Sequence, residues 1–166
     1  NGPYRFPLYL HCMSLFWTDF FKTFAAEVVR QTIGVLRQER DEGIDVLQGT
    51  VASAEPRNRA VVTHVMQLFE FFNSSDNTVP SVASTALYLD FYQQPYTDAA
   101  VAYFRDVSRL LQNSNISDFL KKTLLVVNAE RERTNAYVAA AYREAFARTL
   151  QEKFIANQCD YVIERF

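Results

Sequence analysis

Turn-forming residues are scarce in this sequence, which has 4 glycines and 5 prolines among its 166 residues. All-β folds need many tight turns, and tight turns consume both residue types. Their scarcity argues against an all-β fold and favours long helices. The chain also lacks an apolar run of the roughly 20 residues that a membrane-spanning helix needs, and no signal peptide opens it.

Cysteine and histidine are also rare, with 2 of each. Cys12 and Cys159 are too few for the disulfide framework of a small secreted protein. We therefore expect free thiols in a reducing compartment, cytoplasmic and/or nuclear, and we expect both to be buried because their neighbours are apolar. Asn73 and Asn115 match the glycosylation pattern, but without a secretory signal we interpret both matches as chance.

An excess of positive charge is absent too. The 17 Lys and Arg residues are outnumbered by 19 Asp and Glu residues, which gives a net charge of -2. Proteins that bind nucleic acid or anionic membranes usually carry a basic surface. We therefore expect neither as a partner, and we interpret the interspersed charges as solvated helix faces.

Aromatic residues, by contrast, are abundant, with 14 Phe and 9 Tyr, and the apolar residues follow a helical rhythm. They recur at spacings of three and four in six series, each of which would give one helix an apolar stripe. The series are Tyr9, Met13, Phe16 and Phe20; Val29, Ile33 and Leu36; Val61, Val65, Leu68 and Phe72; Ala100, Phe104, Val107 and Leu111; Ile116, Leu120, Leu124 and Val127; and Ile155, Cys159, Val162 and Phe166. We predict that these residues form the core.

The series and the residues between them predict about six helices. The expected ranges are 8–21, 22–42, 57–73, 82–112, 117–138 and 140–165. Gly43 is the expected stop of the second helix, Pro95 an expected interruption of the fourth, and Ser117 the expected N-cap of the fifth. Two alternatives stay open. The first two helices could form one bent helix, and the last two could fuse into a long rod, because nothing forces a break near residues 137–141.

Residues suited to catalysis or metal binding are few. Neither His11 nor His64 follows a Glu by three residues, as a metal site in a helical bundle would require. The acidic group of Asp41, Glu42 and Asp45 flanks the expected helix end, so we interpret it as capping and solvation. No Gly-rich phosphate loop or nucleophile elbow is present. We expect no catalytic residue, no metal site, no cofactor and no small-molecule ligand.

One charged block stands inside the fifth predicted helix. It runs from Glu130 to Arg133, and the two are spaced to pair on a helix surface, as are Glu144 and Arg148. We interpret this block as a solvated helix face, with a polar contact to a partner protein as the alternative.

The C-terminal half resembles a known family. It contains LYLDF at 87–91, YTDAAVAYF at 96–104, LLQN at 110–113 and ISDFLKK at 116–122, then the acidic–basic run at 130–133, Tyr137-Val138 and Phe154-Ile155. In order and spacing these segments are similar to those of the cullins, without gaps from about residue 88 to the end. The match is too long to arise easily by chance.

The N-terminal half is similar to the same family more weakly. Its matching parts are the Trp17-Thr18-Asp19 group, the run at 36–43 and the segment at 57–72. Residues 45–56 look like an insertion. Where cullins commonly place Ser-Thr, this chain has Ala140-Ala141-Tyr142, which removes an expected N-cap and favours a continuous helix. These departures suggest a divergent member.

The resemblance implies an all-α antiparallel bundle of the cullin-repeat type, with five to six helices. Residues 1–166 would form one repeat segment, approximately the second, with 1–43 as a candidate tail of the repeat before it. The implied function is a non-catalytic scaffold segment of a cullin-RING ubiquitin ligase. The substrate adaptor and the RING subunit would bind mainly outside this segment, so the resemblance assigns no binding residue here.

Two other functions stay open at this point. One is a subunit of an exocyst-like tethering complex or another protein-binding scaffold, since such proteins also stack helical bundles. The other is a small helical enzyme or carrier, which a bound cofactor or a deep apolar pocket with convergent polar groups would indicate.

Overall fold

The structure, a computed structural model, describes residues 8, 12, 15–49, 58–73, 87–112 and 114–165. Every regular element in these ranges is helical. The elements are η1 (Phe16–Phe21), α2 (Lys22–Gln48), α3 (Arg59–Asn73), η2 (Leu87–Gln93), α4 (Gln94–Leu111), α5 (Ile116–Tyr137), η3 (Ala140–Tyr142), α6 (Arg143–Leu150), η4 (Gln151–Ile155) and α7 (Ala156–Arg165). The predicted all-α fold is confirmed.

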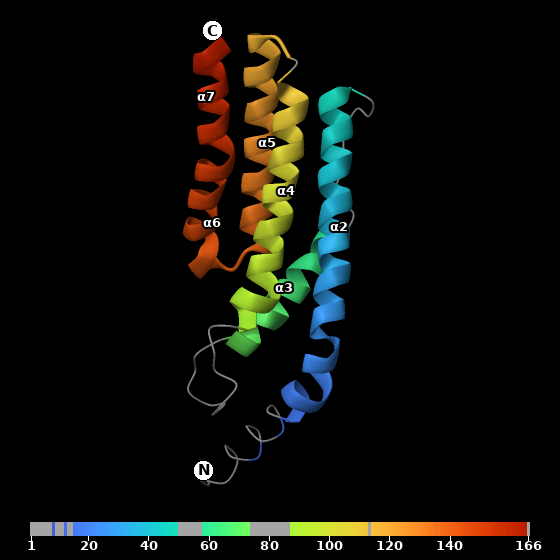
Figure 1. The fold of residues 1–166 in the computed structure, drawn as a ribbon. Helices are drawn as coiled ribbons and strands as arrows, with labels where there is room; N and C mark the ends of the chain where they lie inside the picture. Colours follow the sequence, from blue (N-terminus) through green and yellow to red (C-terminus); the bar gives the residue numbers. More distant parts are fainter. Residues whose placement is uncertain are drawn as a thin grey trace.

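The long helices lie side by side (Figure 1), with α2, α4 and the segment from α6 to α7 running in one direction and α5 in the opposite one. Short connections join α4 to α5 and α5 to α6, so these helices are antiparallel neighbours, as in bundles generally. α2 lies on the other side of α4 from α6 and α7, and α3 packs low in the bundle near the start of α4. The segment from η1 to α2 begins at one end of the bundle, and α5 begins at the other.

The first two predicted helices are one continuous helical segment. The wide turns of η1 pass directly into α2 at Lys22, so the bent-helix alternative is confirmed. The predicted stop at Gly43 is wrong, because α2 continues to Gln48. Gly49 ends it instead, with φ 76° and a backbone N–H bonded to the carbonyls of Asp45 and Val46. At Gly49, and not at Gly43, the backbone takes up the left-handed conformation that glycine tolerates best.

The glycines of α2 give a test of this helix end. Gly34 lies within the helix, and a Cβ there meets no atom within 4 Å, whereas Gly49 has positive φ. We expect Gly34→Ala to raise the free energy of unfolding by roughly 0.5–1 kcal/mol. Gly49→Ala should lower it by about 1–2 kcal/mol. Urea denaturation followed by circular dichroism measures both, and equal effects would contradict the assigned helix end.

The fourth predicted helix does change geometry at Pro95. The wide turns of η2 precede it, and α4 begins at Gln94 with the proline in its first turn, where a missing N–H costs little. The predicted cap of the fifth helix is wrong by two residues. Asn115 is the N-cap, and its side-chain Oδ1 accepts a hydrogen bond from the backbone N–H of Asp118 at 2.9 Å.

The fused-rod alternative for the last two helices is also wrong. Val138 and Ala139 are extended, and they separate α5 from η3. Tertiary hydrogen bonds hold this break. The Ala139 N–H donates to the Tyr88 hydroxyl at 2.8 Å, and the Tyr92 hydroxyl donates to the Tyr137 carbonyl at 2.9 Å. The sequence near residues 137–141 could not indicate the break, because the partners that stabilise it are on η2.

The core matches the prediction on α2 and α4 and differs elsewhere. Val29, Ile33 and Leu36 are buried, as are all four residues of the α4 series. On α3 the prediction is one residue off, because Val62, Met66 and Phe69 are buried while Val61 is exposed. Phe16 and Phe20 are exposed too, and Tyr9, Met13, Phe72, Ile155 and Phe166 lie outside the described side chains.

Most of the predicted stripe of α5 is on the wrong face, although Val127 packs partly buried against the core. Leu120 and Leu124 are exposed, and the buried positions include Phe119, Val126 and Glu130. Polar side chains occupy part of the buried face of this helix. Several of its apolar side chains lie on the outer surface of the bundle instead. Near the C-terminus, Phe154 and Gln158 are buried, and of the predicted series Val162 is partly buried against the core while Cys159 is exposed.

The cysteines also depart from the prediction. Cys12 and Cys159 are free, as expected, but both are exposed rather than buried.

Candidate functional site

The most unusual site in the interior is an ion pair between α2 and α5. Arg40 and Glu130 have side chains that are 1% and 0% exposed. Arg40 Nη2 donates to Glu130 Oε1 at 2.6 Å, and Arg40 Nε donates to Glu130 Oε2 at 3.3 Å. Such a two-pronged contact fixes both the distance and the relative rotation of the helices that carry it.

A second ion pair extends the first along the same interface. Arg133, one turn after Glu130 on α5, donates through Nη1 to Glu130 Oε2 at 3.2 Å and through Nε to Glu39 Oε1 at 2.8 Å. The Tyr137 hydroxyl donates to the other oxygen of Glu39 at 2.9 Å. Two arginines and two glutamates thus alternate, and their formal charges cancel. We call Glu39, Arg40, Glu130 and Arg133 the ion network.

Tyrosines from α4 line the ion network. The Tyr96 hydroxyl donates to Glu130 Oε1 at 3.2 Å, and the Arg40 guanidinium lies over the Tyr96 ring, 5.0 Å from its centroid. The Tyr103 ring lies 5.8 Å from the guanidinium of Arg40 and 6.0 Å from that of Arg133. Aromatic faces stabilise cations that have lost water. The ion network therefore joins three helices, α2, α4 and α5.

The ion network stays charged at neutral pH. Burial alone would raise the pKa of Glu130, but the charges and hydrogen bonds of Arg40 and Arg133 outweigh it and lower that pKa. Burial likewise opposes the charge of Arg40, yet Glu130 and the neighbouring tyrosines raise the pKa of Arg40. Burial, reinforced by the Glu130 charge, raises the pKa of Tyr96, so this tyrosine stays a neutral donor.

The chemistry of the ion network is that of a structural joint. Its carboxylates are already held by arginines and tyrosines, so neither is poised to act as a base. One donor is left over, since Arg40 Nη1 is buried without a hydrogen-bond partner among the described residues. The prediction that residues 130–133 form a solvated face is wrong for Glu130 and Arg133. Only Arg131 and Glu132, between them, are exposed.

Sequence reasoning missed the ion network, although a signal was present. Arg40 continues the spacing of Val29, Ile33 and Leu36 by four residues, which places it on the buried stripe of α2. Glu130 likewise follows the buried Val126 by four residues on α5. A charged residue in register with an apolar stripe indicates a buried partner of opposite charge.

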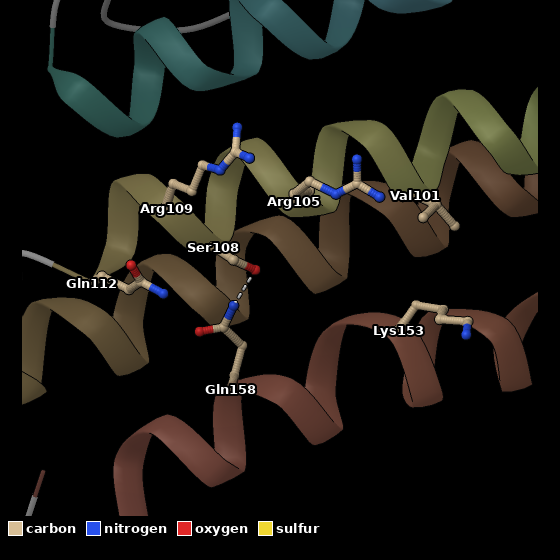
Figure 2. Close-up of a pocket in the computed structure, with 7 residues that line it drawn as sticks. All are labelled: Val101, Arg105, Ser108, Arg109, Gln112, Lys153 and Gln158. Carbon is tan, nitrogen blue, oxygen red and sulfur yellow. Dashed lines mark hydrogen bonds between the residues drawn. The ribbon is translucent and has the colours of Figure 1, made fainter. Parts of the chain in front are cut away.

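A groove opens on the side of α4 that faces η4 and α7, away from α2 (Figure 2). Its volume is about 360 Å³, and its lining residues are Val101, Arg105, Ser108, Arg109, Gln112, Lys153 and Gln158. Figure 2 shows Arg105 and Arg109 side by side on α4, with Lys153 across the groove on the C-terminal segment. Gln158 Nε2 donates to Ser108 Oγ at 2.5 Å and ties the two walls together.

Two apolar surfaces lie toward opposite ends of the bundle. Near the start of the described chain, Phe16, Phe20 and Phe24 are exposed and follow one another along one helix face, with adjacent ring centroids 5.4 and 5.2 Å apart. On the first half of α5, at the far end in Figure 1, the exposed apolar residues are Ile116, Leu120, Leu124 and Leu125. Contiguous exposed apolar surfaces of this kind usually contact another protein surface.

The residues weighed for metal binding or catalysis do not come together. His64 is exposed on α3, and His11 lies outside the described residues. Asp41, Glu42 and Asp45 lie inside α2 rather than at its end, so they cannot act as caps there. Within the described ranges, no group of three or more His, Cys, Asp or Glu side chains is placed to hold a metal ion. Among the same residues, no helix is both long and apolar enough to cross a membrane.

An antiparallel helical bundle with an ion-paired interior and apolar surfaces at both ends is the type of unit that stacks into an α-solenoid scaffold. The family model described as the cullin alpha solenoid domain matches residues 4–166. The chain therefore belongs to the cullin family. No curated protein and no solved structure matched the chain in the corresponding searches.

Proposed function

We propose that this chain is a non-catalytic scaffold segment of a cullin-RING ubiquitin ligase. In this role it is a rigid spacer between the end that holds the substrate adaptor and the end that holds the RING subunit with its ubiquitin-conjugating enzyme. Both partners bind mainly outside residues 1–166, in the cytoplasm and/or nucleus. Residues 1–166 form one cullin-repeat segment, with 1–43 as the candidate tail of the repeat before it.

The observation that carries this proposal is the ion network. A spacer must keep its helices in fixed register, because flexibility would spread the positions of the two reacting ends and reduce the benefit of orienting them. A buried, two-pronged ion pair ties α2 to α5, and tyrosines of α4 pack on it. Such contacts tolerate little sliding, since any shift leaves a buried charge without its partner.

The two exposed apolar surfaces support the same proposal. Helical repeats contact mainly the repeats next to them, so a unit inside a stack needs an apolar surface toward each end. The Phe16–Phe20–Phe24 surface and the Leu120–Leu124 surface lie toward opposite ends of this bundle. A bundle that acted alone would gain nothing from leaving both exposed.

Co-purification of the tagged protein from its own cells tests the ligase assignment. The expected result is recovery of a RING subunit together with a substrate adaptor. A matched pair of variants then tests the spacer role. Glu130→Ala should retain the RING subunit but weaken ubiquitin transfer, while the exposed Glu144→Ala should change neither. Repeated recovery of vesicle-tethering subunits without a RING subunit would contradict the proposal.

A further inference from the structure

We propose that the groove of Arg105, Arg109 and Lys153 binds an extended acidic segment of a partner protein. This goes beyond the spacer role, because it assigns a docking site to the side of the bundle rather than to its ends. Among the described residues that line the groove, Val101 is the one apolar residue and none is acidic. Its chemistry therefore suits an anion rather than an apolar ligand.

The positive charge is concentrated here against the balance of the whole chain. The net charge is -2, yet three cations from two helical elements converge on one groove. Arg105 and Arg109 are four residues apart on one helix, a spacing at which like charges repel. Arg109 forms an ion pair with Asp106 at 3.5 Å, and both side chains are mostly exposed. A pair that long and exposed is weak, so a better placed carboxylate could replace it.

The spacing of the arginines favours an extended peptide. Residues four apart on a helix are separated by about 6 Å along its axis. In an extended strand, side chains on one face repeat about every 6.6–6.8 Å, which is every second residue. A segment with Asp or Glu at alternate positions can therefore offer one carboxylate to Arg105 and the next to Arg109. Lys153 on the opposite wall can then contact the same segment.

The walls of the groove are fixed before any partner binds. Gln158 is buried and donates to Ser108, and Ser108 Oγ in turn donates to the Phe104 carbonyl at 2.7 Å. The neighbouring rings of Phe104 and Phe154 stack with centroids 5.1 Å apart and pack the same two elements together. A groove held in this way loses little entropy on binding. Nucleic acid is a poorer occupant, because three cations on an acidic chain do not form an extended basic surface.

Fluorescence anisotropy with a fluorescein-labelled peptide of alternating Glu and Ser tests the proposal on the 166-residue chain. We expect saturable binding that weakens as salt is added. The double variant Arg105→Glu/Arg109→Glu should weaken it by roughly ten-fold or more. The control Arg37→Glu/Arg131→Glu alters net charge equally, on exposed residues of α2 and α5. It should weaken binding by less than about two-fold. Thermal melts of each variant establish that the fold is retained.

Three results would overturn the proposal. The first is absence of saturable binding at low salt. The second is an equal loss of affinity in both double variants, which would mean that the affinity for the peptide depends on the net charge of the chain and not on the groove. The third is competition by single-stranded oligothymidylate that binds the groove more tightly than the acidic peptide does, which would assign the site to nucleic acid.

Discussion

Glu130→Ala should lower the free energy of unfolding by about 3–5 kcal/mol, because it leaves two arginines buried without their shared carboxylate. Arg40 is 1% exposed and cannot turn to water, and one of its nitrogens already lacks a partner among the described residues. Arg133 would keep its ion pair with Glu39 but lose the one with Glu130. Urea denaturation at neutral pH, followed by circular dichroism, measures the change.

The matched control is Glu144→Ala on α6. Glu144 pairs with Arg148 at 2.6 Å, but these side chains are 81% and 72% exposed. Exposed pairs of this spacing are worth about 0.3–0.5 kcal/mol. Similar losses in the two variants would mean that burial does not set the strength of the ion network.

The pH dependence adds a second readout for Glu130. Its pKa is lowered by folding, so its charge stabilises the fold fully above the unfolded-state pKa of about 4.3. That contribution is lost as the pH falls below this value toward the lower folded-state pKa. The gap in unfolding free energy between wild type and Glu130→Ala should therefore be constant from pH 7 to about 5 and narrow below about 4. A gap that widens on acidification would contradict the assigned charge.

Phe104→Ala should cost about 3–5 kcal/mol, whereas Leu124→Ala should change stability by less than about 0.5 kcal/mol. Both residues belong to apolar series that the sequence places in the core. The structure separates them, because Phe104 is 1% exposed and stacks on Phe154, while Leu124 is 61% exposed. The same denaturation experiment measures both. If Leu124→Ala lowered the free energy of unfolding by several kcal/mol, the α5 series would belong to the core, and the assigned buried face of α5 would be wrong.

The sequence predicts the helices of this fold better than their buried faces. Spacing alone is sufficient on α2 and α4, because their buried faces are apolar over most of their length, as Val29 and Phe104 illustrate. It fails on α5, where Glu130 and Arg133 occupy buried positions and the leucines point outward. Periodicity counts apolar residues and cannot tell a core face from a face that contacts another protein.

Several of the remaining errors share one physical cause, which is that tertiary contacts override local signals. Gly43 suggests a helix end, yet α2 continues through it, and a Cβ there would make an ordinary van der Waals contact with the buried Arg133 side chain at 3.6 Å. The break after Tyr137 has no local sequence signal and depends on the hydroxyls of Tyr88 and Tyr92. The groove at Arg105 and Arg109 could not be predicted from the sequence either, because Lys153, which forms its opposite wall, is distant from them along the chain.

The central claim, that this bundle is a rigid spacer, is tested most directly by a distance distribution across it. Spin labels at Thr23→Cys on α2 and at the exposed native Cys159 on α7, with Cys12→Ser, would be measured by double electron–electron resonance. We expect one narrow peak in the parent chain and a broader one when Glu130→Ala is added. A broad or two-peaked distribution in the parent chain itself would contradict the claim.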